Sequence, residues 1–259
     1  MIISSLKTPI IYPEPDGSPM AESDPARDYL VYGVEALKLY FQNRKDVYVS
    51  GNLWLSYEQG VPDAVVCPDV FVVFGVENRP RRSYRVWQEN GKTPDWVLEI
   101  TSSSTHRKDE KEKPQTYAQM GVSEYFQYDP TGDYLKPRLK GRRLGKQGYK
   151  ILTSEANEKG ILVFPSEVLG LEMHLFADGR LRFLNPESGE YLRTPQESEQ
   201  ERLLEQQRAE QERQRAEQER QRAEQEQQRA EQERQRAEQE RQRAERLAAR
   251  LRELGIDPD

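Results

Sequence analysis

AVVCPDVFVVFGV at residues 64–76 and WVLEI at residues 96–100 are the two stretches that decide the fold. Near-continuous apolar runs of this length are typical of strands in the middle of a sheet whose two faces are both covered. Each run nevertheless contains one acid, Asp69 in the first and Glu99 in the second. Burying a carboxylate is costly unless it is paired or binds a cation. The runs therefore predict two central strands and a site where a positive charge meets two acids.

Two helices are expected beside these strands. Residues 28–42 repeat apolar side chains at helical spacing behind an Asp, which favours a helix beginning there. Residues 106–121 return to a helical composition and end at Gly121, which indicates a left-handed cap. Proline is tolerated only in the first turn of a helix, so Pro114 requires this second helix either to begin late, near Glu110, or to be kinked.

Further strands complete an α/β core with an antiparallel extension. Residues 47–57 are rich in strand-forming side chains, and EYFQYDP at residues 124–130 predicts a strand that ends at its proline. Short strands and hairpins separated by Gly, Asp and Asn are expected around residues 134–152, 160–164, 168–176 and 180–184.

The polar excess of the chain is concentrated in its C-terminal part. Hydrophobic residues make up 35% of the sequence, charged residues 32%, and the mean hydropathy is -0.97, which is too polar for one globular domain. After residue 196 almost only Glu, Gln, Arg and Ala occur. We therefore expect a loop or disordered leader at residues 1–27, a globular domain at 28–195 and a charged helical tail at 196–259.

Alanine recurs every seven residues in the tail, from Ala209 to Ala244, within the unit QRAEQER. A dimeric coiled coil needs two apolar positions per heptad, and here there is one, filled by a small side chain. Opposite charges three and four residues apart, such as Glu210 with Arg213, stabilise an isolated helix. A solvated single helix and a weak coiled coil both remain open.

The overall charge gives no attraction for nucleic acid. Residues 1–196 carry 27 acidic and 25 basic side chains, so a nucleic-acid surface would have to be local. One segment without acidic residues contains Lys136, Arg138, Lys140, Arg142, Arg143, Lys146 and Lys150. Two interpretations have equal weight: a hairpin that follows a phosphate backbone, and basic side chains that keep an edge strand from aggregating.

The cysteine, histidine and glycine patterns exclude other kinds of site. The single Cys67 excludes an internal disulfide and a Cys-rich zinc site, and its apolar neighbours predict a buried thiol. Two histidines are too few for a zinc triad, and a Gly-rich phosphate loop is missing, so no small-molecule cofactor is expected. Without a signal peptide or a membrane-spanning apolar run, we expect a soluble cytoplasmic protein with no membrane partner.

The two acids point to metal chemistry. If their strands are neighbours, Asp69 and Glu99 could hold one Mg²⁺, a hard ion that prefers carboxylates, carbonyls and water. Such an ion would polarise a phosphodiester and lower the pKa of a bound water. The alternatives are that each acid lies exposed at a strand end or forms a salt bridge in the core.

A lysine could join the two acids. Asp109, Lys113 and Tyr117 follow each other at intervals of four residues and so share one face of a helix. Lys113 would then orient the attacking water or neutralise the charge that develops on the phosphate. From spacing alone, a solvated lysine in a run of charges with Lys108 and Lys111 is the better interpretation.

Six segments, in order along the chain, resemble the Uma-two family of bacterial restriction-endonuclease-like proteins, a branch of the PD-(D/E)XK nuclease superfamily. They are CPDVFVVFG, WVLEITSSST, the D-x-x-x-K-x-x-x-Y pattern of Asp109, Lys113 and Tyr117, GVSEYFQYDP, LKPRLKG and SEVLGLEM. The resemblance covers residues 28–195, and the terminal LGIDPD is also similar to that family. It implies a restriction-endonuclease-like α/β fold, a mixed sheet flanked by helices, with the antiparallel extension and a long C-terminal helix.

The resemblance also implies a metal site. It makes Asp69 the first acid of the superfamily motif and Glu99 the second, and it implies Asp69, Glu99 and Ile100 as ligands of Mg²⁺ or Mn²⁺. The superfamily places a lysine two residues after the second acid, where this chain has Thr101. Lys113 is the expected substitute for that lysine.

The resulting expectation is a metal-dependent endonuclease that hydrolyses phosphodiester bonds of DNA. In it Asp69 and Glu99 hold the ion, Lys113 assists the water and Asp109 supports Lys113. The alternative is a catalytically degenerate nuclease-fold module that binds nucleic acid or a protein, with the tail as a coiled-coil assembly element. DNA is the expected partner, and the formation of a homodimer stays open.

Overall fold

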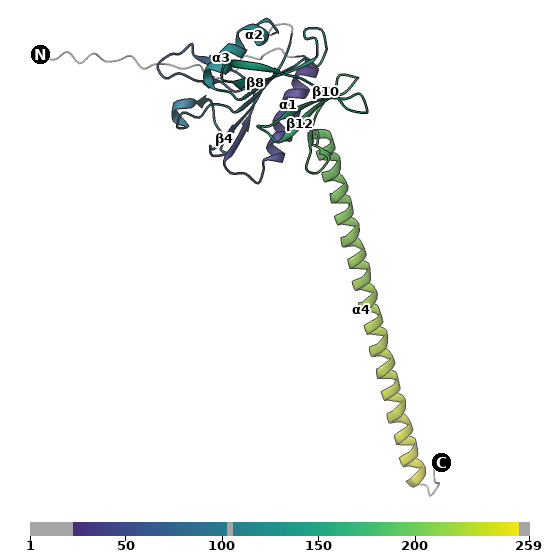
Figure 1. Cartoon of the computed structure of the whole chain (residues 1–259). Coiled ribbons are helices and arrows are strands. Elements are labelled where there is room, and N and C mark those ends of the chain that lie inside the picture. Colours follow the sequence, from purple (N-terminus) through teal and green to yellow (C-terminus); the bar gives the residue numbers. More distant parts are fainter. Residues whose placement is uncertain (1–22, 103–105, 254–259) are drawn as a thin grey trace, which may run out of the picture. The chain divides into compact units, whose positions relative to one another are not determined.

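The computed structural model of the chain describes residues 23–102 and 106–253. The chain divides into two compact units, Met1–Glu197 and Ser198–Asp259. The first contains an α/β fold and the second consists of most of one long helix, α4 (Pro195–Glu253) (Figure 1). None of the helices within the described residues combines the length and the apolar character that a membrane crossing requires.

A six-stranded mixed sheet forms the centre of the first unit. In spatial order its strands are β1 (Val47–Ser50), β4 (Val70–Phe74), β6 (Trp96–Ile100), β7 (Glu124–Tyr128), β8 (Leu139–Gly145) and β9 (Gly148–Leu152). β6 and β7 run parallel, and all other neighbours in the sheet run antiparallel. The two apolar runs are thus neighbouring central strands, β4 and β6, as the expected metal site requires.

Two smaller sheets accompany the central one. The predicted antiparallel extension is confirmed from residue 155 on, and it consists of β10 (Glu155–Ala156), β11 (Leu162–Ser166), β12 (Leu171–Leu175), β13 (Leu181–Asn185) and β14 (Glu190–Tyr191). The strands expected at residues 134–152 belong instead to the central sheet as β8 and β9, because β8 pairs with β7. A three-stranded sheet consists of β3 (Val65–Val66), β2 (Leu55–Ser56) and β5 (Tyr84–Arg85). The β-rich segment at residues 47–57 forms two strands, β1 and β2, with Asn52 at a positive φ of 48° between them.

Different layers cover the two faces of the central sheet. One face, which we call the α1 face, packs against α1 (Asp24–Tyr40) and the antiparallel extension in a core that includes Trp96, Leu98 and Phe126. The other, the α3 face, packs against α3 (Lys113–Met120) and the three-stranded sheet in a core that includes Val97 and Tyr125. Figure 1 shows α1 beside β12, and α2 (His106–Lys111) beside α3.

The first helix begins earlier than its apolar stripe predicted. α1 starts at Asp24, because the Ser23 hydroxyl accepts a hydrogen bond from the Ala26 amide at 3.4 Å and Pro25 stands in the first turn, where its missing N–H is not needed. The expected leader at residues 1–27 was wrong in its last four residues. Residues 1–22 lie outside the described part of the chain.

The second expected helix is broken in two. α2 ends at Lys111 and α3 begins at Lys113, so Pro114 falls in the first turn of a new helix, which it tolerates. Of the alternatives left open by the sequence, the kinked helix is nearer to the structure. The left-handed cap is confirmed, since Gly121 has a φ of 82°.

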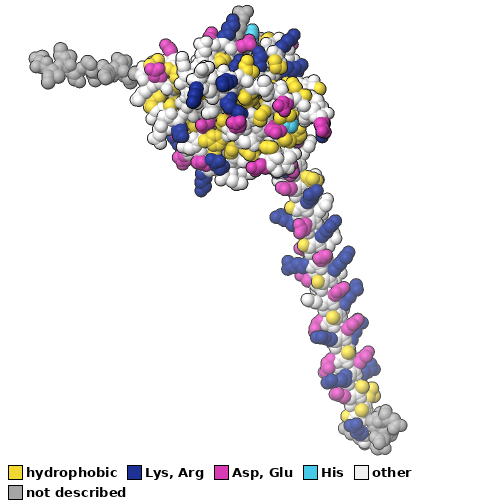
Figure 2. Space-filling model, viewed as in Figure 1, with side chains coloured by type: hydrophobic (Ala, Val, Ile, Leu, Met, Phe, Trp, Pro, Cys, Tyr) yellow, Lys and Arg dark blue, Asp and Glu magenta, His cyan; other side chains and the backbone are white. Residues whose placement is uncertain are grey.

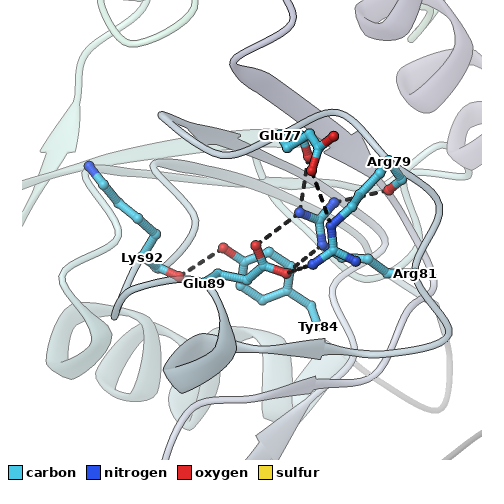
Figure 3. A network of polar contacts seen from close by, with 6 residues as sticks. All are labelled: Glu77, Arg79, Arg81, Tyr84, Glu89 and Lys92. Carbon is cyan, nitrogen blue, oxygen red and sulfur yellow. Dashed lines mark hydrogen bonds and ion pairs between the residues drawn. The ribbon is translucent and has the colours of Figure 1, made fainter.

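A long connection from β4 to β6 is fixed by one arginine (Figure 3). Arg81, with a side chain 2% exposed, donates two hydrogen bonds to Glu89 and two more to the backbone carbonyls of Glu77 and Arg79. Its guanidinium also lies 4.1 Å from the centre of the Tyr48 ring. This network was not predicted, and it holds in place the connection between the two strands that position Asp69 and Glu99.

Cys67 departs from its expected environment. Its side chain is half-buried rather than buried, and the thiol donates a weak hydrogen bond to the Asn52 amide oxygen at 3.4 Å. The reason is its place between β3 and β4, where the chain leaves one sheet and enters another, so the apolar run is not one continuous strand.

The tail begins with reciprocal capping. The Glu197 amide donates to the Thr194 hydroxyl at 3.2 Å, and the Thr194 amide donates to the Glu197 carboxylate at 2.8 Å. Beyond this turn, side chains of opposite charge alternate along α4 (Figure 2). The expected long C-terminal helix is confirmed, whereas its state of association stays a prediction.

Candidate active site

Both predicted acids lie at the same end of two neighbouring strands. Asp69 directly precedes β4, and Glu99 is the fourth residue of β6. The Asp69 carboxylate accepts a hydrogen bond from the backbone N–H of Ile100 at 2.7 Å, which attaches it to β6 beside Glu99. Glu99 is completely buried. The antiparallel pairing of β4 and β6 therefore brings the two carboxylates together on the α3 face.

A glycine lets Asp69 reach this position. A Cβ atom on Gly51, at the end of β1, would stand 2.1 Å from the backbone oxygen of Asp69 and 2.7 Å from a methyl group of Val34. Only a residue without a side chain allows this close approach of two backbones. Gly51 thus helps to fix the entry of the chain into β4.

Lys113 joins the acids from the helical side. Its ammonium lies 2.8 Å from Oε2 of Glu99 and 2.8 Å from Oδ1 of Asp109, and its side chain is only 20% exposed. The break between α2 and α3 makes Lys113 the first residue of α3 and directs it toward β6. The solvated lysine favoured by spacing alone was therefore wrong, because the local run of charges gave no information on the packing of α3 against the sheet.

Two tyrosines and a glutamine complete the surroundings. The Tyr117 hydroxyl donates to Oε1 of Glu99 at 2.5 Å, and the Tyr125 hydroxyl donates to the backbone carbonyl of Asp109 at 2.8 Å. Gln127 stands opposite Glu99 in the pairing of β6 with β7. Sequence reasoning placed Tyr117 on the right helix face without giving it a role, and it missed Tyr125 and Gln127. The alternation of EYFQY could have placed these two on one face of a strand.

The site holds more negative than positive charge. Burial, and then repulsion by Glu99, raise the pKa of Asp69 well above its ordinary value, against the opposing effect of Lys113. Burial also raises the pKa of Glu99, although Lys113 acts in the opposite direction. Burial would lower the pKa of Lys113, but Glu99 and Asp109 together raise it above its ordinary value, so the ammonium stays protonated at neutral pH. Three carboxylates and one ammonium leave room for a further cation.

The donor atoms of the site fit a hard divalent ion in part. Asp69 and Glu99 supply carboxylate oxygens, which Mg²⁺ and Mn²⁺ prefer, and buried Oδ2 of Asp109 has no hydrogen-bond partner in the described residues. Within residues 23–102 and 106–253, however, no three His, Cys, Asp or Glu side chains are grouped so as to hold a metal ion. Two acids are therefore the side-chain ligands available, and Ile100 can add only its backbone carbonyl.

Thr101 stands where the superfamily motif has its lysine. The residue is 2% exposed, and its hydroxyl oxygen has no hydrogen-bond partner among the residues described. The positive charge beside Glu99 comes instead from Lys113 on α3. Whether Lys113 takes the place of the motif lysine in a reaction stays a prediction.

The seven basic residues of the predicted hairpin are separated by the structure. They lie on β8, on β9 and in the adjoining turns, and β9 is an edge strand of the sheet. Lys140 pairs with Glu110 at 2.7 Å, and Arg143 pairs with buried Glu124 at 2.8 Å. Arg138 donates to a backbone carbonyl, while Lys136, Lys146 and Lys150 are exposed. Since acids on other elements neutralise part of the set, these residues do not form one continuous cationic strip.

The fold is the mixed α/β fold, with a sheet flanked by helices, that the sequence predicted. Residues 23–175 match the family model of Uma2, which carries the description "Putative restriction endonuclease". The chain belongs to this family, and the resemblance inferred from its sequence is confirmed.

Other comparisons add little. No curated protein shows significant sequence similarity to the chain. Among solved structures, the chain is similar to a protein described as a putative nuclease belonging to DUF820 from Anabaena variabilis, with 13% sequence identity and a TM-score of 0.43. The similarity covers 58% of this chain and 76% of the other.

Proposed function

We propose that this protein is an endonuclease that hydrolyses phosphodiester bonds of DNA and depends on Mg²⁺ or Mn²⁺. The observation that carries the proposal is the convergence of Asp69, Glu99 and Lys113, with the ammonium 2.8 Å from Glu99, on one face of the sheet. Membership of a family described as restriction endonucleases supports a nuclease role.

Each residue has a distinct part in the proposed reaction. Asp69 and Glu99 would hold the ion, together with the backbone carbonyl of Ile100. When bound, such an ion polarises the phosphate and lowers the pKa of a water molecule. Because the pKa of Lys113 is raised, this residue is a poor proton acceptor, and it stabilises the negative charge that develops on the phosphate. Asp109 orients Lys113 through its 2.8 Å contact.

One observation favours a second candidate, a degenerate module that binds nucleic acid or protein without cleaving it. Both carboxylate oxygens of Glu99 have protein partners, Tyr117 on Oε1 and Lys113 on Oε2. A carboxylate with partners on both oxygens is also found in structural ion pairs. Such a pair would stabilise the packing of α3 without taking part in a reaction. This alternative predicts binding that is independent of metal.

Cleavage of supercoiled plasmid and of single-stranded DNA with Mg²⁺ or Mn²⁺ distinguishes the two. The native chain is compared with Asp69→Asn, Glu99→Gln and Lys113→Ala, and with Glu58→Gln, which removes an exposed acid far from the site in sequence. We expect metal-dependent nicking in the native chain and the Glu58 variant, and loss of nicking in the other three. Nicking that persists in both acid variants, or is lacking in the native chain, would contradict the proposal.

A further inference from the structure

We propose that Arg142 binds a backbone phosphate of the substrate strand, and that Gln127 orients it for this contact. The inference rests on the proposed function, because it assigns a contact for the same substrate beside the same site.

Arg142 lies on the same face of the sheet as Glu99. Glu99 stands opposite Gln127 on β7, and Gln127 stands opposite Lys140 on β8. Arg142 follows two residues after Lys140, and side chains two residues apart in a strand point to the same face. It lies two strands across and two residues along the sheet from Glu99, a backbone separation of about 12 Å, and this is the axial span of between three and four phosphates on one strand of B-DNA. One backbone can therefore contact both residues.

The positive charge of Arg142 has no acidic partner. Its guanidinium donates to the Gln127 side-chain oxygen and lies 5.6 Å from the centre of the Tyr125 ring, and it makes no ion pair among the described residues. Glu110 is near enough to interact electrostatically with Arg142, but its hydrogen bond goes to Lys140. The neutral partner fixes the direction of the guanidinium and leaves its charge available to an anion.

The next residue shows the opposite arrangement. Arg143 points to the α1 face, where Glu124 and Glu167 both accept hydrogen bonds from it. Glu124 is completely buried, so this pair belongs to the contact between the central sheet and the antiparallel extension. Arg142 and Arg143 are adjacent on β8 but differ in role. Two acids neutralise Arg143 inside the fold, whereas the Gln127 amide holds Arg142.

Gln127 indicates a place for a further polar group. The residue is completely buried, its oxygen accepts from Arg142, and its Nε2 has no hydrogen-bond partner within the described residues. A buried amide nitrogen without a partner is rare in proteins and calls for an acceptor from a water or a ligand. Buried Gln127 is thus placed to hold the Arg142 guanidinium, and a guanidinium binds phosphate oxygens through two parallel N–H groups.

The region is also open to a ligand. Arg142, Lys140 and Ile151 border a groove of about 400 Å³ at the edge of the sheet, whose other walls come from the α1 side, among them Leu139 and Phe164. Ile151 on β9 is 77% exposed and stands opposite Arg142. An exposed apolar side chain beside the unpaired charge of Arg142 matches a nucleic-acid strand, which presents bases and phosphates alternately.

The test is the affinity of the full chain for a fluorescent DNA duplex, measured by anisotropy with Ca²⁺ at several salt concentrations. Arg142→Gln is compared with Lys150→Gln, which removes one charge from an exposed residue of the same hairpin on the α1 face. We expect Arg142→Gln to weaken binding about tenfold and to reduce the slope of log affinity against log salt by about 1. Lys150→Gln should change neither, and Arg142→Lys should keep most of the slope.

Two further outcomes separate this inference from the proposed function. A native chain that nicks and binds DNA, with Arg142→Gln binding like Lys150→Gln, overturns the inference and leaves the nuclease intact. A native chain that neither binds nor nicks DNA overturns both. If Arg142→Gln does not fold, Gln127→Glu serves instead, because an acid there would neutralise Arg142 in place. Binding by a folded Gln127→Glu variant equal to that of the native chain overturns the inference.

Discussion

The two faces of the central sheet are made by alternate residues of the same strands, and they differ in kind. The α1 face presents Trp96, Leu98 and Phe126 to a core of apolar side chains. The α3 face has apolar residues too, but it also places Glu99 and Gln127 in the middle of the sheet. Both faces bury an acid, but on the α1 face Glu124 is neutralised by Arg143, whereas the α3 face gathers Glu99 and Asp109 around the single ammonium of Lys113, as functional sites commonly do.

The largest loss of stability is expected from a substitution in the core on the α1 face. Phe126→Ala removes a completely buried ring and leaves a cavity between the sheet and the antiparallel extension. We expect the free energy of unfolding to fall by roughly 3–5 kcal/mol, measured by denaturant titration. A loss below about 1 kcal/mol would show that this face is not the main core of the domain.

A smaller loss of stability is expected from Lys113→Met on the α3 face. The substitution leaves Glu99 and Asp109 buried without their counter-ion, and we expect a loss of roughly 3 kcal/mol in metal-free buffer. The double variant Lys113→Met with Glu99→Gln should recover part of this loss, because the unpaired charge is gone. If the double variant is less stable than the single one, the contact does not act through charge.

The raised pKa of Asp69 should make the stability of the folded protein depend on pH. Its pKa is raised in the folded protein, so the folded state holds a proton that the unfolded state has already released. The free energy of unfolding should therefore fall as pH rises from the ordinary carboxyl range through the raised pKa. In metal-free buffer Asp69→Asn should abolish this part of the dependence, whereas Asp63→Asn, at an exposed acid, should not. An equal dependence in both variants would assign the effect to other groups.

The smallest effect is expected from removal of the tail. We propose that residues 1–197 fold without α4, so truncation after Glu197 should change the free energy of unfolding of the first unit by less than about 0.5 kcal/mol. Truncation after Gln196 should have a slightly larger effect, because Arg182 loses its partner Glu197 at 2.9 Å. Loss of cooperative unfolding in the longer fragment would contradict this boundary.

The sequence allowed the strands of the site to be predicted better than the contacts between its residues. Asp69 and Glu99 were identifiable because apolar neighbours on both sides made a charge there unusual. The contact of Lys113 with Glu99 could not be predicted, because it depends on the break between α2 and α3 at Glu112 and on the packing of α3 against the sheet. The different roles of Arg142 and Arg143 depend on the position of acids far away in the sequence, which alternation along one strand does not reveal.

Binding of Mn²⁺ to the full chain, measured by titration calorimetry, tests most directly the central claim that the α3 face holds a metal site. We expect one ion per chain for the native protein and loss of binding in Asp69→Asn and Glu99→Gln. Lys113→Met should keep its binding, because the ammonium of Lys113 competes with the ion for Glu99. Equal binding by the native chain and both acid variants, or no binding by any of them, would contradict the claim.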